Sequence, residues 1–93
     1  MAARELVLPA SPDEVLLRAA LVLKRLGARI TRYDGEAGTL EARAGRRLLP
    51  EVVRLHAAAE GAERTRVAIA SDTTDWRALV AQLAAALRAT PWR

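Results

Sequence analysis

The chain has no cysteine and no phenylalanine, and it has a single histidine. Without cysteine, disulfides, thiolate metal ligands and redox chemistry at sulfur are excluded. The aromatic residues are Tyr33, Trp76 and Trp92, and the apolar residues are mostly Ala, Leu and Val. The 93 residues are enough for one domain (1–93) with a modest core. A core of small aliphatic side chains does not favour a large internal cavity.

Long apolar runs are also missing. Residues 1–8 lack the hydrophobic stretch of a signal peptide. The longest apolar segment, Leu16–Leu26, is interrupted by Arg18, Lys24 and Arg25, so it cannot span a bilayer. We therefore expect a cytoplasmic protein with no membrane partner.

Basic charge is nearly all arginine. The formal net charge is +4, and 14 of the 15 basic residues are Arg. A compositional bias of the genome explains this in one way. An anion-binding surface explains it in another, because the guanidinium group suits phosphate and carboxylate.

The order of the apolar patterns indicates the fold class. Ser11-Pro12-Asp13-Glu14 is a helix start with a capping box, and Gly27 ends that helix. Alternating or apolar runs separated by turn residues predict strands, and Asp72-Thr73-Thr74-Asp75 predicts the start of a last amphipathic helix. The predicted strands are 4–8, 28–33, 39–44, 49–58 and 64–71.

This β-α-β-β-β-β-α order predicts an α+β fold with one antiparallel sheet. Each helix has an apolar stripe to bury, so we expect both on the same face of the sheet. A one-residue slip in register would invert a strand. On the opposite face we expect Arg29, Thr31, Tyr33, Thr39, Glu41, Arg43, Arg54, His56, Arg64 and Arg66.

The element order resembles the TATA-box-binding-protein-like fold and the helix-grip proteins of the START type. The segments that carry the resemblance are the capped helix from Ser11, the hairpin Tyr33–Leu40 and the closing helix from Asp75. The layout is also similar to that of small bacterial domains. The resemblance implies a fold and no transferable functional residue. The chain lacks the aromatic residues of a helix-grip cavity and the Phe wedges of TATA-box binding.

Arginines form the first candidate site. A basic sheet face could bind an anion or a nucleic acid, although Tyr33 is the one aromatic residue expected there for base stacking. A solvated surface with cross-strand Arg–Glu pairs is the alternative. The candidate anion-binding residues are Arg29, Arg43, Arg46, Arg47, Arg54 and Arg66.

Two other polar candidates have simpler explanations. His56 has no Cys or second His with which to share a metal, so we expect an ordinary surface or half-buried histidine. Asp72 and Asp75 could be paired carboxylates, but their place at a predicted helix start favours capping. No glycine-rich nucleotide-binding motif is present. We predict no catalytic residue, metal or cofactor.

The apolar candidates are a cleft and a tail. A small apolar ligand would lie between the sheet and the last helix, although the same side chains are the expected core. Trp92, after Pro91, either folds back on the domain or docks on a partner. The residues of the predicted cleft are Leu40, Leu55, Val67, Ile69, Leu79 and Leu83.

We therefore predict a small non-enzymatic binding or protein-interaction module. A homo-oligomer is expected, with a dimer favoured, through an edge strand or the helix layer, because a small domain with a thin core gains stability by association. The alternative is binding of nucleic acid or another polyanion through the arginine-bearing face.

Overall fold

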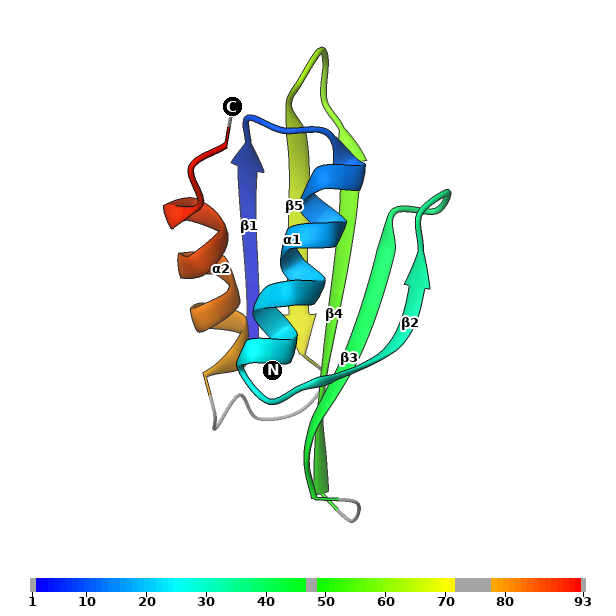
Figure 1. The fold of residues 1–93 in the computed structure, drawn as a ribbon, viewed down its shortest axis with the longest axis vertical. Coiled ribbons are helices and arrows are strands. Elements are labelled where there is room, and N and C mark those ends of the chain that lie inside the picture. The colour runs from blue at the N-terminus through cyan, green and yellow to red at the C-terminus, as the bar shows by residue number, and fades with distance from the viewer. Residues whose placement is uncertain (1, 47–48, 72–77, 93) are drawn as a thin grey trace.

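The described part of the chain contains five strands and two helices in the predicted order (Figure 1). A computed structural model describes residues 2–46, 49–71 and 78–92. The predicted α+β class and β-α-β-β-β-β-α order are confirmed. The elements are β1 (Ala2–Leu8), α1 (Pro12–Arg25), β2 (Arg29–Asp34), β3 (Thr39–Arg46), β4 (Leu49–Ala59), β5 (Thr65–Ser71) and α2 (Leu79–Ala89).

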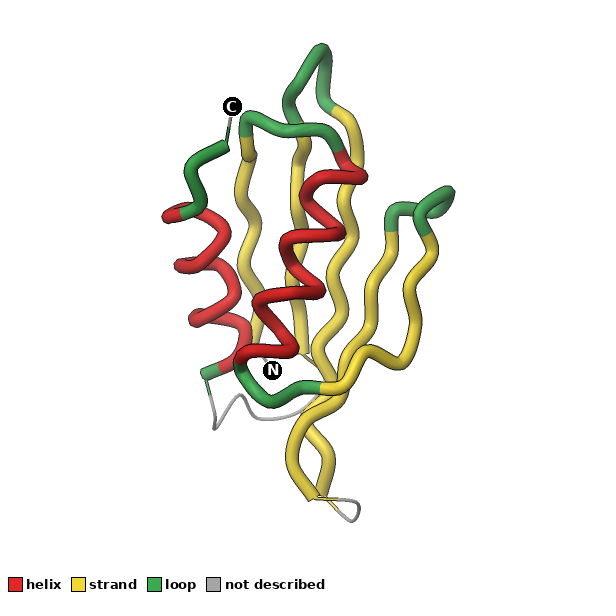
Figure 2. The backbone as a smooth tube through the Cα atoms, viewed as in Figure 1, coloured by secondary structure: helices red, strands yellow, loops and turns green. Residues whose placement is uncertain are grey.

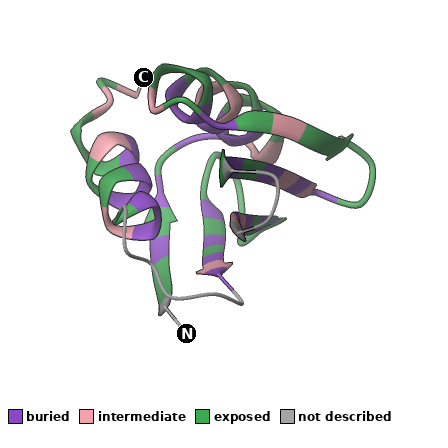
Figure 3. Ribbon diagram, turned by 90° about the horizontal axis from the view of Figure 1, so that it is seen from below, coloured by how far each residue is buried: buried purple, intermediate pink, exposed green. Residues whose placement is uncertain are grey.

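All five strands belong to one antiparallel sheet of order β1-β5-β4-β3-β2. Strands β2 to β5 follow one another as hairpins, whereas β1 pairs with β5. Helix α1 therefore connects one edge strand to the other and crosses the sheet (Figure 1). Both helices lie on the same face, as predicted, and the opposite face carries neither of them (Figure 3).

The capping box of α1 forms as the sequence predicts. The Ser11 hydroxyl accepts the backbone N–H of Glu14 at 3.3 Å, and the Glu14 carboxylate accepts the backbone N–H of Ser11 at 3.1 Å. The core lies between α1, α2 and the inward side of the sheet, where β5 alternates buried and exposed residues along most of its length. Buried Thr65 is held there by a hydrogen bond from its hydroxyl to the Ala10 carbonyl at 2.6 Å.

The start of the last helix differs from the prediction. Helix α2 begins at Leu79, not at Asp75, because Ala78 has a left-handed backbone conformation with φ of 55° and ends any continuous helix there. Asp72, Asp75 and Trp76 lie outside the described residues, so their predicted capping and packing roles stay predictions.

The exposed face also differs from the prediction at one residue. A β-bulge lies between Ile30 and Arg32 in β2, and it adds one residue opposite Glu41 of β3. The bulge turns Tyr33 to the helix side of the sheet, opposite core residue Leu40. Partial burial, and then the Asp13 carboxylate of α1, raise the pKa of Tyr33. The prediction that placed Tyr33 on the open face is therefore wrong.

Strands β3 and β4 continue together beyond the other strands as a two-stranded arm (Figure 2). Arg46 pairs with Leu49 at its end, whereas β2 pairs with β3 no further than Arg43. The predicted turn at Gly45 is instead part of strand β3. Gly45 has φ of 90°, a backbone conformation that glycine adopts readily because it has no Cβ.

A candidate anion-binding face

The face of the sheet opposite the helices carries the polar side chains of alternate strand positions. Arg29 and Arg32 of β2, Arg43 of β3 and Arg54 of β4 are all exposed on it. Arg29 lies directly opposite Arg43 across the β2–β3 ladder. In the neighbouring row, Arg32 and Arg54 lie on either side of Glu41. We call Arg29, Arg32, Arg43 and Arg54 the arginine patch.

Glu41 is the carboxylate at the centre of the arginine patch. Its Oε1 accepts the Thr31 hydroxyl at 3.1 Å, and its Oε2 accepts Nε of Arg54 at 3.1 Å. The hydrogen bond from Thr31 is the main cause that lowers the pKa of Glu41. Burial opposes it, and the hydrogen bond from Arg54 and the charges of Arg54 and Arg43 lower the pKa further. One ionised carboxylate therefore lies among four guanidinium groups, and the patch keeps an excess of positive charge.

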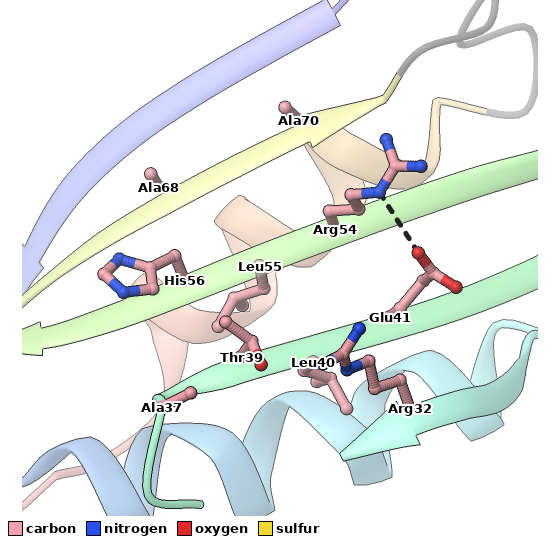
Figure 4. Close-up of a pocket in the computed structure, with 10 residues that line it drawn as sticks. All are labelled: Arg32, Ala37, Thr39, Leu40, Glu41, Arg54, Leu55, His56, Ala68 and Ala70. Carbon is pink, nitrogen blue, oxygen red and sulfur yellow. Dashed lines mark hydrogen bonds and ion pairs between the residues drawn. The ribbon is translucent and has the colours of Figure 1, made fainter. Parts of the chain in front are cut away.

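A hollow of about 440 Å³ adjoins the patch (Figure 4). Ala68 and Ala70 of β5 line one side of the hollow, where their short methyl groups stand beside the longer side chains of β4 (Figure 4). Arg54 lies opposite Ala70, and His56 lies opposite Ala68. The hollow thus combines a small apolar floor with cationic and hydrogen-bonding groups at its rim.

Arg66 lies on the same face but is engaged elsewhere. Its Nε contacts Glu60 at 2.5 Å, and its Nη1 contacts Glu5 at 3.0 Å. Two carboxylates already surround this guanidinium, so it does not add to the excess charge of the arginine patch. Among the described residues, no ion pair is found for Arg29, Arg32 or Arg43.

The remaining predicted anion-binding residues are Arg46 and Arg47. Arg47 lies outside the described residues, and the side chain of Arg46 is not described either, so their role stays a prediction. The structure places Arg29, Arg43 and Arg54 on one face of the sheet, and their role in binding an anion stays a prediction. Arg32 was absent from the predicted set, because the bulge that turns it toward Glu41 has no clear signal in the sequence.

His56 is exposed and lies opposite Thr39 on β3. In the part of the chain that the structure describes, no group of three or more His, Cys, Asp or Glu side chains could hold a metal ion. No described helix is long and apolar enough to cross a membrane. The imidazole of His56 lies at the rim of the hollow, which it lines together with Thr39.

The side chains of the predicted apolar cleft form part of the core. All six are at most 2% exposed and pack between the sheet and the helices. They are Leu40, Leu55, Val67, Ile69, Leu79 and Leu83. The hollow at the sheet face touches Leu40 and Leu55 from the side of the sheet that carries no helix, and the hollows at the β2–β3 turn and beside α1 touch none of the six. An apolar ligand between the sheet and the last helix stays a prediction.

Trp92 folds back on the domain, the first of the two alternatives. Its indole N–H donates to the Leu87 carbonyl at 2.8 Å, and the ring packs against the edge of the core. One side of the residue stays accessible beside α1.

Comparison with known proteins supports the fold. No family model matches the chain, and no curated protein matches it. The structure is similar to a chain of the adenylate sensor from AMP-activated protein kinase, solved in complex with 5-aminoimidazole-4-carboxamide 1-β-D-ribofuranotide (ZMP). The TM-score is 0.68 at 15% identity, over 91% of this chain and 95% of that chain. At this identity the likeness shows a shared α+β fold. A chain of a regulatory sensor and the present small domain therefore have the same architecture.

Proposed function

We propose that this chain is a small non-enzymatic binding module that receives a phosphate-bearing ligand on its open sheet face. The observation that carries the proposal is the arginine patch, in which four guanidinium groups surround one carboxylate beside a hollow of about 440 Å³. Guanidinium groups pair with phosphate oxygens through two parallel N–H donors.

The cross-strand pair of Arg29 and Arg43 supports a negatively charged ligand. Like charges directly across an antiparallel ladder are destabilising, so this pair opposes folding as long as no anion lies between them. Natural sequences depart from locally stable choices mainly at functional sites. A bound phosphate would turn the repulsion into attraction.

The dimensions favour one or two phosphate groups with an attached flat group. Neighbouring strands are about 4.8 Å apart and alternate residues about 7 Å apart, so the patch spans roughly 10 Å by 7 Å at the backbone. The adjoining hollow is within the range of small-molecule sites, about 300–1,000 Å³. A nucleotide has the required chemistry. The similar chain comes from an adenylate sensor solved with the ribonucleotide ZMP, which makes a nucleotide the natural first ligand to test.

A polymeric ligand is the second candidate. The element order also resembles the TATA-box-binding-protein-like and helix-grip groups, and the first of these groups includes nucleic-acid binders. A single strand could place its phosphates along the arginine patch and its bases over Ala68 and Ala70. Aromatic stacking partners are scarce on this face, which favours the smaller ligand.

The experiment is a titration of a fluorescein-labelled oligothymidylate, followed by anisotropy at several salt concentrations, with AMP as competitor. Four contacts on a single strand predict a slope of log K against log salt of about −3, at about −0.7 for each phosphate neutralised. The double variant Arg29→Gln/Arg43→Gln should flatten the slope by about 1.4. It should also weaken binding roughly tenfold, at about 0.7 kcal/mol per exposed contact.

The matched control is Arg64→Gln/Arg88→Gln, which removes the same charge from residues outside the arginine patch. If AMP at low concentration displaces the oligothymidylate, a nucleotide is the favoured ligand. If the oligothymidylate binds tightly and AMP does not displace it, a nucleic-acid strand is the favoured ligand. Equal losses in the two double variants, or no detectable binding of either probe by the wild-type chain, would refute the proposal.

A further inference from the structure

Helix α1 carries two exposed leucines on the side that faces away from the core. Leu17 is 61% exposed and Leu21 is 49% exposed. Residues four apart lie on the same side of a helix one turn from each other, so the two side chains form one apolar strip. The inward side of the same helix is occupied by Val15, Leu16, Ala19, Val22 and Leu23, which are buried.

A groove runs beside this strip. It has a volume of about 300 Å³ and lies between α1 and the C-terminal segment after α2. Trp92 forms part of its wall, and the hydrogen bond of its indole N–H to Leu87 holds that wall in place. The groove is lined by Glu14, Leu17, Arg18, Leu21, Thr90, Pro91 and Trp92.

The charges at the two ends of α1 are of opposite sign. Asp13 and Glu14 lie in its first turn, and Lys24 and Arg25 lie in its last turn. All four are exposed and flank the leucine strip along the helix. An antiparallel copy of the same helix would place its basic turn against the acidic turn, at both ends of the contact.

We propose that a second copy of this chain docks on α1, with the two α1 helices antiparallel about a twofold axis between Leu17 and Leu21. A leucine of each copy then enters the groove between α1 and the Trp92 segment of the other. The pairing is isologous, because one surface supplies both the protruding leucines and the groove that receives them. A parallel arrangement would bring acidic turn against acidic turn and basic against basic.

The helix layer is a better place for self-association than the β2 edge of the sheet. Strand β2 is bulged next to Thr31 and carries Arg29 and Arg32, features that discourage edge-to-edge pairing. A contact made by one helix and a short tail segment is small, at the lower end of specific interfaces, below about 1,200 Å² in total. The dissociation constant of the dimer should therefore be about micromolar or higher.

The proposal is tested by sedimentation velocity of the full chain over a concentration series. The wild-type chain should show a reversible monomer–dimer equilibrium, and Leu17→Gln/Leu21→Gln should stay monomeric while keeping its thermal unfolding midpoint. The control Val7→Gln changes an apolar residue that is 36% exposed on the sheet, and it should dimerise like the wild type.

A charge-swap pair tests whether the charged turns of α1 meet in the dimer. Lys24→Glu/Arg25→Glu should not self-associate, Asp13→Lys should self-associate more weakly than the wild type because Glu14 remains, and a mixture of the two variants should form a heterodimer. A wild-type chain that stays monomeric up to about 1 mM overturns the proposal, because its free energy of dimerisation would then be weaker than about −4 kcal/mol. A dimer that survives Leu17→Gln/Leu21→Gln, or a mixture that forms no heterodimer, overturns it as well.

Discussion

Gly38, at the end of the β2–β3 turn, is the position where a single methyl group should be most damaging. Its φ is +72°, a left-handed conformation that side chains disfavour. A Cβ there would overlap the backbone carbonyl oxygen of Ala57 on β4. The same two residues are joined by a hydrogen bond of 2.7 Å from the Ala57 N–H to the Gly38 carbonyl, so the backbones cannot separate without losing it.

The expected cost of Gly38→Ala follows from these two effects. The left-handed conformation costs about 1–2 kcal/mol, and forcing an atom into a packed region costs about 1–3 kcal/mol more. The free energy of unfolding should therefore fall by roughly 2–5 kcal/mol, a large part of the ~5–14 kcal/mol expected for a domain of this size.

Two other glycines separate the effects in urea denaturation. Gly61 has φ of +102° with open space around its Cβ position, so Gly61→Ala should cost about 1–2 kcal/mol. The Cβ position of Gly35 meets nothing nearer than the Asp13 carboxylate at 4.0 Å, and no left-handed φ applies there, so Gly35→Ala should be within about 0.5 kcal/mol of the wild type. If Gly38→Ala costs no more than Gly61→Ala, the close approach of the β2–β3 turn to β4 is wrong.

Three further predictions concern the candidate site and the tail. Arg29→Glu should stabilise the chain by about 0.2–1 kcal/mol at low salt, by pairing with Arg43, while it weakens phosphate binding; a loss of stability in urea denaturation would contradict this. The pKa of Glu41 is lowered in the folded state, so its stabilising effect is complete above the ordinary value of 4.5 and is lost as pH falls below it. Thermal unfolding midpoints of wild type and Glu41→Gln should accordingly converge as pH falls below that value, and a constant difference would count against the Glu41 network. Trp92→Phe removes the hydrogen bond to Leu87 and should cost about 1 kcal/mol in urea denaturation, whereas no change would indicate a detached tail.

The element order could be predicted because local signals and tertiary structure agree along most of the chain. The capping box at Ser11 and the alternation of β5 each specify one element and its buried side. The strand at 39–44 was predicted too short, because Gly45 is a frequent turn residue and its place inside a strand depends on pairing with Pro50 of β4.

The candidate site was harder to predict than the fold. Arg29, Arg43 and Arg54 converge because three strands pair in one register, and that register depends on a bulge that no motif announces. The same bulge decides that Arg32 joins the arginine patch and that Tyr33 leaves the open face. The start of α2 was missed for a related reason, since the left-handed backbone of Ala78 is set by the surrounding chain and not by alanine itself.

The most direct test of the central claim is an amide NMR titration of the uniformly ¹⁵N-labelled chain with AMP. Saturable shifts should be confined to the open sheet face of β2, β3 and β4 and centred on Thr31, Glu41 and Arg54, and they should be lost in Arg29→Gln/Arg43→Gln. Saturable shifts that centre on α1 or α2 would contradict a phosphate-binding role for the arginine patch. The absence of shifts both with millimolar AMP and with an oligothymidylate would contradict it as well.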